Sequence, residues 1–262
     1  MTTAAPPTRD LGARSRIEDA VLNASAPPQQ RWLDGWLLRH CPAKAKRARC
    51  INPLAPGRLP LAERLALAEQ FYAAQGLPLL VRITPFVPAG LDAALAERGL
   101  VRQDETLVMA HPALAEHFSS DPAPDDTLPP GTTLQPVDAD TYADVVGSLR
   151  GTPLEQRRAH AERLRASPVP YQGFVLGGIA CGQLAREDER VGLYDVFVAP
   201  GARGHGLARQ LCAALLRRAV SEGARTGYLQ VEPDNPAAQR VYTRLGFREV
   251  YRYHYRVRPG AG

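Results

Sequence analysis

The chain has 262 residues, 45% of them hydrophobic, which is enough to form one large core or two smaller ones. Its net charge of +5 comes mostly from dispersed arginines, its four cysteines form no C-x-x-C pair, and no run of about 18 apolar residues or signal-peptide core occurs. The composition therefore excludes a disulfide scaffold and a membrane-spanning protein, and we expect a cytoplasmic protein with reduced thiols that binds neither nucleic acid nor membrane.

The sequence divides into two units joined by a linker. Residues 1–15 are small, polar and proline-containing, so we expect them to be disordered. The unit that follows, residues 16–118, contains a predicted helix over 61–75 and a predicted strand over 79–85. Residues 119–130 are rich in proline and acidic residues, as is typical of a linker, and the second unit spans residues 131–262.

The second unit shows a regular succession of strand and helix patterns. Strands are predicted over 133–137, 171–178, 179–185, 191–198, 228–232 and 247–257, and helices over about 138–149, 153–165, 206–221 and 236–245. The resulting order is β-α-α-β-β-β-α-β-α-β. The three consecutive strands between 171 and 198 are separated by glycines or a charged turn, which favours an antiparallel meander.

A glycine-rich loop, Gly201-Ala-Arg-Gly-His-Gly206, joins the strand ending at Val198 to the helix that begins at Gly206. Its glycines leave backbone N–H groups uncovered at a helix N-terminus, where unpaired donors and the positive end of the helix dipole favour an anion. Two nucleotide motifs do not fit. The dinucleotide fingerprint has another spacing, and the phosphate loop needs Lys and a hydroxyl where Leu207 and Ala208 stand. A glycine-rich turn without a ligand is the alternative.

Three motifs of the second unit fit one known pattern. Arg203, Gly206 and Ala208 match Q/R-x-x-G-x-G/A, the preceding strand ends in Val198-Ala-Pro200, and the segment from 235 to 247 reads N-x-x-A-x-x-x-Y-x-x-x-G-F. On these motifs, residues 131–258 resemble the GNAT superfamily of N-acetyltransferases. The resemblance implies an α/β (α+β) acyl-CoA-binding fold, in which a mixed, largely antiparallel sheet is flanked by helices.

The same resemblance implies a site for acetyl-CoA. Backbone amides from Arg203 to Ala208 would hold the pyrophosphate, and the strand edge at Phe197 and Val198 would pair with the pantetheine arm. The side chain of His205 is expected to face solvent, and the histidines show no metal-ligand spacing, so no metal is expected. The full set of predicted cofactor-binding residues is Phe197, Val198, Arg203, Gly204, His205, Gly206, Leu207, Ala208, Asn235 and Ala238.

Acetyl transfer to an amine requires a neutral amine, a donor for the developing negative charge and a proton for the departing thiolate. Tyr242 matches the family's usual acid, and a phenol with a reference pKa of about 10 is protonated at neutral pH. A packed core aromatic is the alternative for Tyr242. Asn235 resembles a cofactor-contacting asparagine, and it equally suits a helix cap before Pro236.

Two acidic residues are candidates for the general base or for an anchor of the substrate amine. Asp195 lies inside the apolar strand over 191–198, where an unpaired carboxylate is costly to bury, and Glu232 ends the neighbouring strand. Strict strand alternation places Asp195 on the same face as Leu193 and Phe197.

Landmarks in the two units recur 147 residues apart, which indicates an internal repeat. We therefore interpret residues 16–118 as a degenerate copy of the same fold that completes the acceptor cleft and packs its sheet and helix faces against the second copy. The copy has lost the cofactor residues, so one acetyl-CoA is expected per chain. The paired landmarks are Pro53 with Pro200, Gly76 with Gly223, and Gly99 with Gly246, and the lost positions hold Pro56, Leu59, Leu61 and Leu95 in place of Arg203, Gly206, Ala208 and Tyr242.

The leading hypothesis is an acetyl-CoA-dependent N-acetyltransferase, a monomer or homodimer, that moves an acetyl group directly to a primary amine of a small molecule or protein. The alternative is a non-catalytic acyl-CoA-binding sensor or interaction module. Aromatic and basic residues of the first unit are further candidates for substrate or partner contacts, with strand core as the alternative for the two tryptophans. These are Trp32, Trp36, Arg39, Lys44, Lys46, Arg47 and Arg49.

Overall fold

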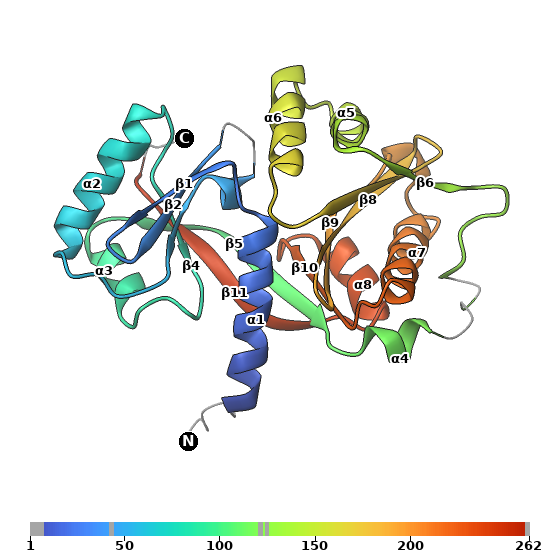
Figure 1. Cartoon of the computed structure of the whole chain (residues 1–262), viewed down its shortest axis with the longest axis horizontal. Coiled ribbons are helices and arrows are strands. Elements are labelled where there is room, and N and C mark those ends of the chain that lie inside the picture. Colours follow the sequence, from blue (N-terminus) through green and yellow to red (C-terminus); the bar gives the residue numbers. More distant parts are fainter. Residues whose placement is uncertain (1–7, 42–44, 120–122, 124–125, 260–262) are drawn as a thin grey trace.

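The computed structural model describes residues 8–41, 45–119, 123 and 126–259. Its strands form one 11-stranded sheet in the order β1-β2-β3-β4-β11-β5-β10-β9-β8-β7-β6 (Figure 1). Only the pairs β3–β4 and β9–β10 are parallel, so the sheet is mixed and largely antiparallel, as the sequence predicted.

Both halves of the chain contain helices and strands. In the first half they are α1 (Thr8–Ala24), β1 (Gln29–Leu33), β2 (Trp36–His40), η1 (Lys46–Ala48), β3 (Ile51–Pro53), α2 (Leu61–Ala74), β4 (Leu80–Ile83), α3 (Leu91–Glu97), β5 (Val101–His111) and α4 (Leu114–Phe118). In the second half they are β6 (Leu134–Val137), α5 (Ala139–Leu149), α6 (Leu154–Arg165), β7 (Tyr171–Leu176), β8 (Ala180–Glu187), β9 (Arg190–Val198), η3 (Pro200–Ala202), α7 (Leu207–Ser221), β10 (Thr226–Val231), α8 (Pro236–Arg244) and β11 (Arg248–Val257). Apart from the short η3, the order predicted for the second half is confirmed.

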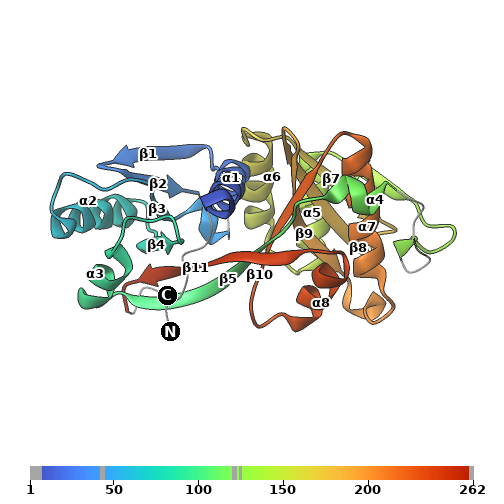
Figure 2. The same cartoon turned by 90° about the horizontal axis from the view of Figure 1, so that it is seen from below.

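The helix α1 corrects the prediction for the N-terminus. Residues 8–15 were expected to be disordered with the rest of 1–15, but α1 begins at Thr8, while residues 1–7 lie outside the described part. The last turns of α1 explain the difference, because Ile17, Val21 and Ala24 are buried against the sheet. A helix anchored in this way extends toward its polar start more easily than it nucleates alone. In Figures 1 and 2, α1 lies over the middle of the molecule, where the two halves meet.

The linker prediction is tested only in part, because 120–122 and 124–125 lie outside the described residues. The end of this stretch is held against the second half. Asp126 is buried, its carboxylate forms an ion pair with Arg209 on α7 at 2.7 Å, and its carbonyl accepts a hydrogen bond from Arg217. The linker is therefore fixed to α7 at this point.

The two halves join through exchanged strands. β5 of the first half lies between β10 and β11, and β11 of the second half lies between β4 and β5 (Figure 2). The expectation that the halves pack through sheet and helix faces is therefore wrong. Both halves instead share one continuous sheet, because each terminal strand satisfies the backbone groups of a strand from the other half.

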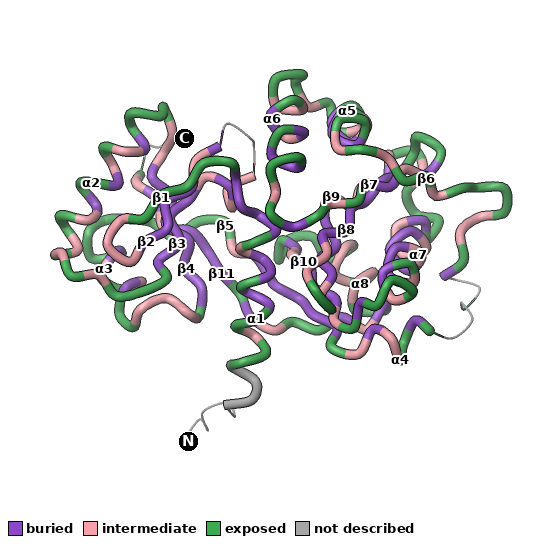
Figure 3. Tube along the Cα trace, in the orientation of Figure 1, coloured by how far each residue is buried: buried purple, intermediate pink, exposed green. Residues whose placement is uncertain are grey.

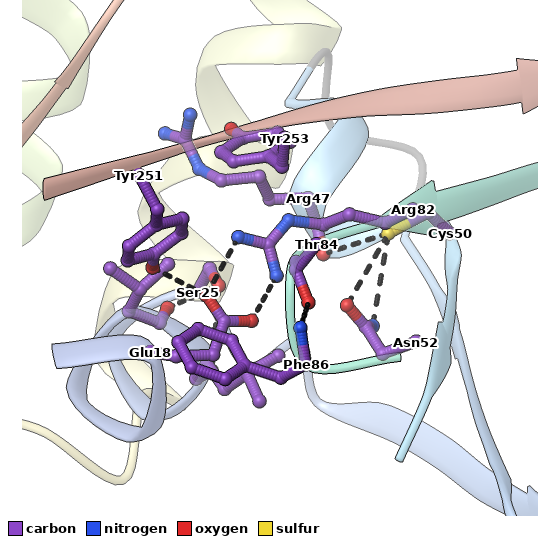
Figure 4. Close-up of polar contacts among 12 residues, drawn as sticks. Glu18, Ser25, Arg47, Cys50, Asn52, Arg82, Thr84, Phe86, Tyr251 and Tyr253 are labelled. Carbon is purple, nitrogen blue, oxygen red and sulfur yellow. Dashed lines mark hydrogen bonds and ion pairs between the residues drawn. The ribbon is translucent and has the colours of Figure 1, made fainter. Parts of the chain in front are cut away.

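A buried ion pair and a hydrogen bond join α1 to the neighbouring strands β4 and β11 (Figure 4). Arg82 on β4 donates to both oxygens of Glu18 on α1, and the hydroxyl of Tyr251 on β11 donates to Glu18 at 2.5 Å. Because the charges are mutually compensated and hydrogen-bonded, this group can be buried at the centre of the fold.

Burial follows the strands and the inner faces of the helices, while the outer turns of α2 and α6 are exposed (Figure 3). The four cysteines are free and buried, as the sequence predicted. Trp36 is part of the first-half core, whereas Trp32 is 64% exposed. No helix in the described ranges is long and apolar enough to cross a membrane.

Candidate active site

The second half of β9 has a free edge. Its parallel pairing with β10 runs only from Arg190–Leu193 to Thr226–Leu229, although β9 continues to Val198 and β10 to Val231. The ladder recorded for the described residues therefore leaves the edge of β9 beyond Leu193 unpaired on the β10 side. A free edge of this kind can accept an extended ligand by backbone pairing.

A β-bulge lies at the start of this free edge. Cys181 and Gln183 of β8 face Phe197 and Tyr194 of β9, so one residue of β8 lies opposite two of β9. Asp195, one of those two, has a φ of 49°, in the left-handed region that a non-glycine residue seldom adopts. The bulge turns the Asp195 carboxylate to a position that regular strand geometry would not give it.

The bulge corrects the alternation expected for β9. Leu193, Val196 and Val198 all pack with the core that includes α7, whereas Phe197 packs with α5. Leu193 and Phe197 are thus on opposite faces, although strict alternation placed them together with Asp195. The extra residue reverses the face assignment for everything beyond it.

The glycine loop after β9 is open to a ligand. Gly204 and Gly206 have φ values of +86° and +79°, and a side-chain carbon added at either position would meet no atom within 4 Å. No hydrogen bond among the described residues uses the backbone amides of 204–208, at the N-terminus of α7. Several N–H donors therefore point into free space at the positive end of a helix, as an anion site requires.

A cavity of about 560 Å³, here called the loop cavity, lies between the end of β9, the glycine loop and α8. His205 is exposed and does not line it. Asn235 lines it and also caps α8, accepting a hydrogen bond from the amide of Ala238 at 3.1 Å. The predicted cofactor residues that line it are Phe197, Val198, Arg203, Gly204, Gly206, Leu207, Ala208, Asn235 and Ala238.

Tyr242 lines the same cavity. Its ring is partly buried, lies 6.3 Å from the ring of Phe247 and packs against the core. Burial, with a smaller effect of Cys212, raises the pKa of the Tyr242 hydroxyl above its ordinary value. The hydroxyl is therefore protonated at neutral pH, and Tyr242 is a packed aromatic residue that also lines the cavity.

A second cavity, of about 260 Å³, adjoins the first at Arg150, which lines both. We call it the arginine cavity. Its walls come from α5, α6, β9 and, in the first half, the end of α1 and the segment around η1. The ionisable side chains that line it are Arg47, Arg150, Arg157, Arg163, His160 and Asp195.

Asp195 is the centre of an ionic cluster in the arginine cavity. Its carboxylate lies 2.9 Å from the guanidinium of Arg150 and 3.3 Å from Nε2 of His160, and 26% of the side chain is exposed. Burial alone would raise the pKa of Asp195, but the hydrogen bond from His160 and the nearby positive charges outweigh it and lower that pKa well below its ordinary value. A carboxylate held ionised in this way is a poor proton acceptor and a good anchor.

The three predicted catalytic residues line three different cavities. Tyr242 lines the loop cavity and Asp195 the arginine cavity, while Glu232 is exposed and lines a third cavity with Asp104 and Asp234. The loop and arginine cavities share Arg150, and the arginine and third cavities share Arg47. The cavities of Tyr242 and Asp195 thus adjoin each other, whereas the cavity of Glu232 adjoins only the arginine cavity.

Several residues of the site were not singled out from the sequence. His160 and Arg163 lie in the predicted helix over 153–165, and Arg150 follows the helix before it, but nothing in their spacing relates them to Asp195 more than 30 residues later. Arg47 was among the basic candidates of the first unit, whereas Lys44 lies outside the described residues. Within the described ranges, no group of three or more His, Cys, Asp or Glu side chains could hold a metal ion.

By sequence, the chain is similar to one family of proteins and to several individual proteins. The model of the family described as "Probable histone acetyltransferase Rv0428c C-terminal" matches residues 13–256. The "Uncharacterized N-acetyltransferase YobR" of Bacillus subtilis (strain 168) is 28% identical over 233 residues, which cover 87% of this chain and 92% of that protein. The mycothiol acetyltransferase of Catenulispora acidiphila is 32% identical over 171 residues, which cover 59% of this chain and 54% of that protein.

Solved structures show the same fold. A GCN5-related N-acetyltransferase from Kribbella flavida superposes with a TM-score of 0.66 at 17% identity, covering 98% of this chain and 97% of its own. A "Tandem GNAT protein from the clavulanic acid biosynthesis pathway" gives a TM-score of 0.61 at 17% identity, covering 79% of this chain and 74% of its own. The fold predicted from the glycine loop and its flanking motifs is confirmed.

Proposed function

The chain belongs to the Rv0428c C-terminal acetyltransferase family, and we propose that it is an acetyl-CoA-dependent enzyme that transfers an acetyl group directly to a primary amine. The observation that carries this proposal is the pair of cavities that meet at Arg150, on either side of the bulged end of β9. One offers unpaired backbone amides to a pyrophosphate, and the other offers an ionic cluster to an acceptor.

Acetyl-CoA supplies an acetyl group activated as a thioester. The residues of the loop cavity fit this molecule, since free amides at 204–208 suit its phosphates and the free edge of β9 at Phe197 and Val198 suits its amide-containing arm. Tyr242, kept protonated by burial, donates its proton to the departing sulfur.

His160 is the general base in this proposal, and Asp195 is its positioning residue. The imidazole is 19% exposed, lines the arginine cavity and is held by the Asp195 carboxylate through Nε2. An imidazole oriented by a carboxylate can accept a proton from the acceptor ammonium, which leaves the neutral amine that attacks the thioester. The low pKa of Asp195 makes that carboxylate a weak base.

The first half completes the acceptor site in this proposal. Ser25, Arg47 and Ala48 line the arginine cavity opposite α5 and α6, so the cavity exists only where both halves meet. Four elements of the first half also recur 147 residues later: α2 as α7, β4 as β10, α3 as α8 and β5 as β11. This recurrence supports a degenerate copy of the GNAT fold in residues 16–118.

Replacement of Tyr242 by Phe tests the proposed chemistry. The variant removes one hydroxyl and little volume, so kcat should fall by about 10²–10⁴-fold, the range for a general acid. The Kd for acetyl-CoA should be unchanged in titration calorimetry. Tyr72→Phe is the matched control, because its hydroxyl donates to the carbonyl of Arg39, far from the loop cavity.

The alternative of a non-catalytic acyl-CoA sensor makes the opposite forecast. A sensor would bind acetyl-CoA without turning it over with any member of a panel of primary amines. Transfer to at least one amine by the wild-type chain, lost in Tyr242→Phe and kept in Tyr72→Phe, would support the enzyme. A wild-type rate in Tyr242→Phe would contradict the role of its hydroxyl.

A further inference from the structure

The arginine cavity carries more positive charge than the proposed transfer to an amine needs. Four guanidinium groups line a space of about 260 Å³, and Asp195 is the one carboxylate among its described lining residues. An acceptor amine is itself cationic before it loses a proton, so an excess of guanidinium groups would oppose its approach. We therefore expect the acceptor to have a feature that compensates for this excess positive charge.

Two of the four arginines are neutralised within the chain. Arg150 is paired with Asp195 at 2.9 Å. Arg157 is paired with Asp144 at 3.0 Å and also donates to the carbonyl of Thr152 and the hydroxyl of Ser148. These contacts fix both side chains in the cavity wall and account for their charge.

The other two, Arg47 and Arg163, have no ion pair within the described ranges. Arg163 is 7% exposed and lies over the ring of Tyr171, with its central carbon 5.5 Å from the ring centre. Arg47 runs beside the ring of Tyr253 (Figure 4), and its Nε is buried without a hydrogen-bond partner. The central carbon of Arg47 also lies 6.0 Å from the ring centre of Tyr194. Both guanidinium groups therefore rest on aromatic rings, and no described carboxylate forms an ion pair with either, so an anionic ligand would supply the absent counter-charge.

We propose that the acceptor is a small primary amine that also carries an oxyanion group, a carboxylate or a phosphate, which Arg47 and Arg163 hold while the amine faces His160 and Asp195. This inference rests on the proposed function and names its substrate class. The planar guanidinium fork matches both oxyanions, often through two parallel hydrogen bonds. Because Arg47 comes from the first half and Arg163 from α6, selection of the acceptor needs both halves.

The same geometry argues against a lysine-rich protein tail as acceptor. The cavity is small for a peptide, since ligand pockets commonly span roughly 300–1,000 Å³. Neighbouring lysines or arginines of such a tail would meet Arg47 and Arg163 with like charge.

Direct binding tests the inference without relying on turnover. The full chain, saturated with CoA, is titrated by calorimetry with O-phosphoethanolamine, β-alanine, ethanolamine and a lysine-rich peptide. The two anionic amines should bind at least about tenfold more tightly than ethanolamine, since a hydrogen bond to a charged group contributes about 1.5–3 kcal/mol. The ranking of phosphate against carboxylate then identifies the oxyanion. Equal binding of ethanolamine, or tighter binding of the peptide, would overturn the inference.

Variants connect the preference to the two arginines. Arg47→Gln should weaken O-phosphoethanolamine or β-alanine by about 10- to 100-fold and leave ethanolamine unchanged. Arg163→Gln should do the same, and unchanged CoA affinity shows that this buried change leaves the fold intact. Arg158→Gln, an exposed neighbour on α6 outside the cavity, is the control. Unchanged anion affinity in both cavity variants would contradict the proposal.

Acetyl transfer is then measured separately with the same amines. Anion-selective binding without any transfer would support the oxyanion site at Arg47 and Arg163 and refute the proposed function. Transfer to ethanolamine as efficient as transfer to the anionic amines would do the reverse. The two proposals therefore fail in distinguishable ways.

Discussion

The loop before α7 and the loop before α2 occupy corresponding positions in the proposed 147-residue repeat, but their backbone amides differ in hydrogen bonding. In the second half the amides of 204–208 are free. In the first half the amides of Arg58 and Leu59, the equivalents of His205 and Gly206, donate to the carboxylate of Asp34 at 2.8–2.9 Å. The chain itself supplies an anion to the first loop, so a similar piece of backbone is closed in one half and open in the other.

The helices that follow differ in the same sense. Leu95 on α3, equivalent to Tyr242 on α8, is fully buried in the first-half core. Tyr242 instead lines the loop cavity with its hydroxyl protonated. If the first half is a degenerate copy, as we propose, it has the elements that build the sheet, while a carboxylate and an apolar side chain occupy the positions that correspond to the loop cavity.

The largest expected effect comes from separating the halves. Residues 131–262 expressed alone lack β5, which pairs with both β10 and β11 at the centre of the sheet. Unpaired backbone groups on two long strands and an exposed apolar face should make this fragment aggregate or remain unfolded, without detectable activity. Circular dichroism and size-exclusion chromatography measure this directly.

Co-expression with residues 1–118 is the control for that fragment. It restores β5 and should recover a soluble complex that binds acetyl-CoA. A second half that is monomeric, folded and fully active alone would show that β5 is dispensable. This result would contradict the requirement for a sheet shared by both halves.

The next largest effect is expected on acetyl-CoA affinity when a negative charge is introduced into each of the two loops. Gly206→Glu places a carboxylate among the free amides, where it would occupy the proposed pyrophosphate site, so the affinity for acetyl-CoA should fall about 1,000-fold or more. This estimate takes three lost hydrogen bonds to a charged group at about 1.5–3 kcal/mol each. Leu59→Glu adds the same charge at the corresponding position of the first loop and should leave the affinity unchanged. Equal losses in calorimetry would contradict a site confined to the second half.

The sequence predicted the second-half fold well because its signals are local. Periodicity and the glycine loop each act within a few residues, and the observed strands and helices follow the predicted order. The strand exchange could not be predicted, because β5 and β11 have similar patterns and either could pair with its own half. Only the competition between long-range pairings decides that, and it leaves no local signal.

The candidate site divides in the same way. The loop cavity was predicted from contiguous motifs. All of the predicted cofactor-binding residues line it except His205. The arginine cavity could not be predicted from the sequence, because its residues come from separate segments that only the fold brings together. These residues include Arg47, Arg150, His160 and Asp195. The bulge at Asp195 also escaped prediction, because strand periodicity assumes regular geometry.

A smaller effect on stability is expected at Gly57, where the first loop approaches Asp34. A side-chain carbon at this position would overlap the Asp34 carboxylate and the Arg64 guanidinium. Gly57→Ala should therefore displace these two side-chain ends and weaken their hydrogen bonds to the loop, which lowers the free energy of unfolding by about 1 kcal/mol. Gly201→Ala in the open loop, where an added carbon meets nothing within 4 Å, should change the free energy of unfolding little. Urea unfolding of both variants checks the contrast, and equal effects would refute it.

The smallest expected effect is a pH dependence at Asp34. Hydrogen bonds from the amides of Arg58 and Leu59 lower the pKa of its carboxyl below the ordinary value. A carboxyl with a lowered folded-state pKa stabilises the protein above its unfolded-state pKa of about 3.9, and this contribution is lost as the pH falls through the folded-state value. Asp34→Asn should therefore lower the melting temperature at pH 6–7, and the difference from wild type should shrink below about pH 4. Asp188→Asn, in the exposed turn between β8 and β9, is the control and should not show this pattern.

Acetyl-CoA should bind with a stoichiometry of one to wild type and Asp34→Asn alike, because Pro56 and Pro60 supply no N–H to the first loop. A second molecule bound to Asp34→Asn would mean that Asp34 alone keeps the first loop closed.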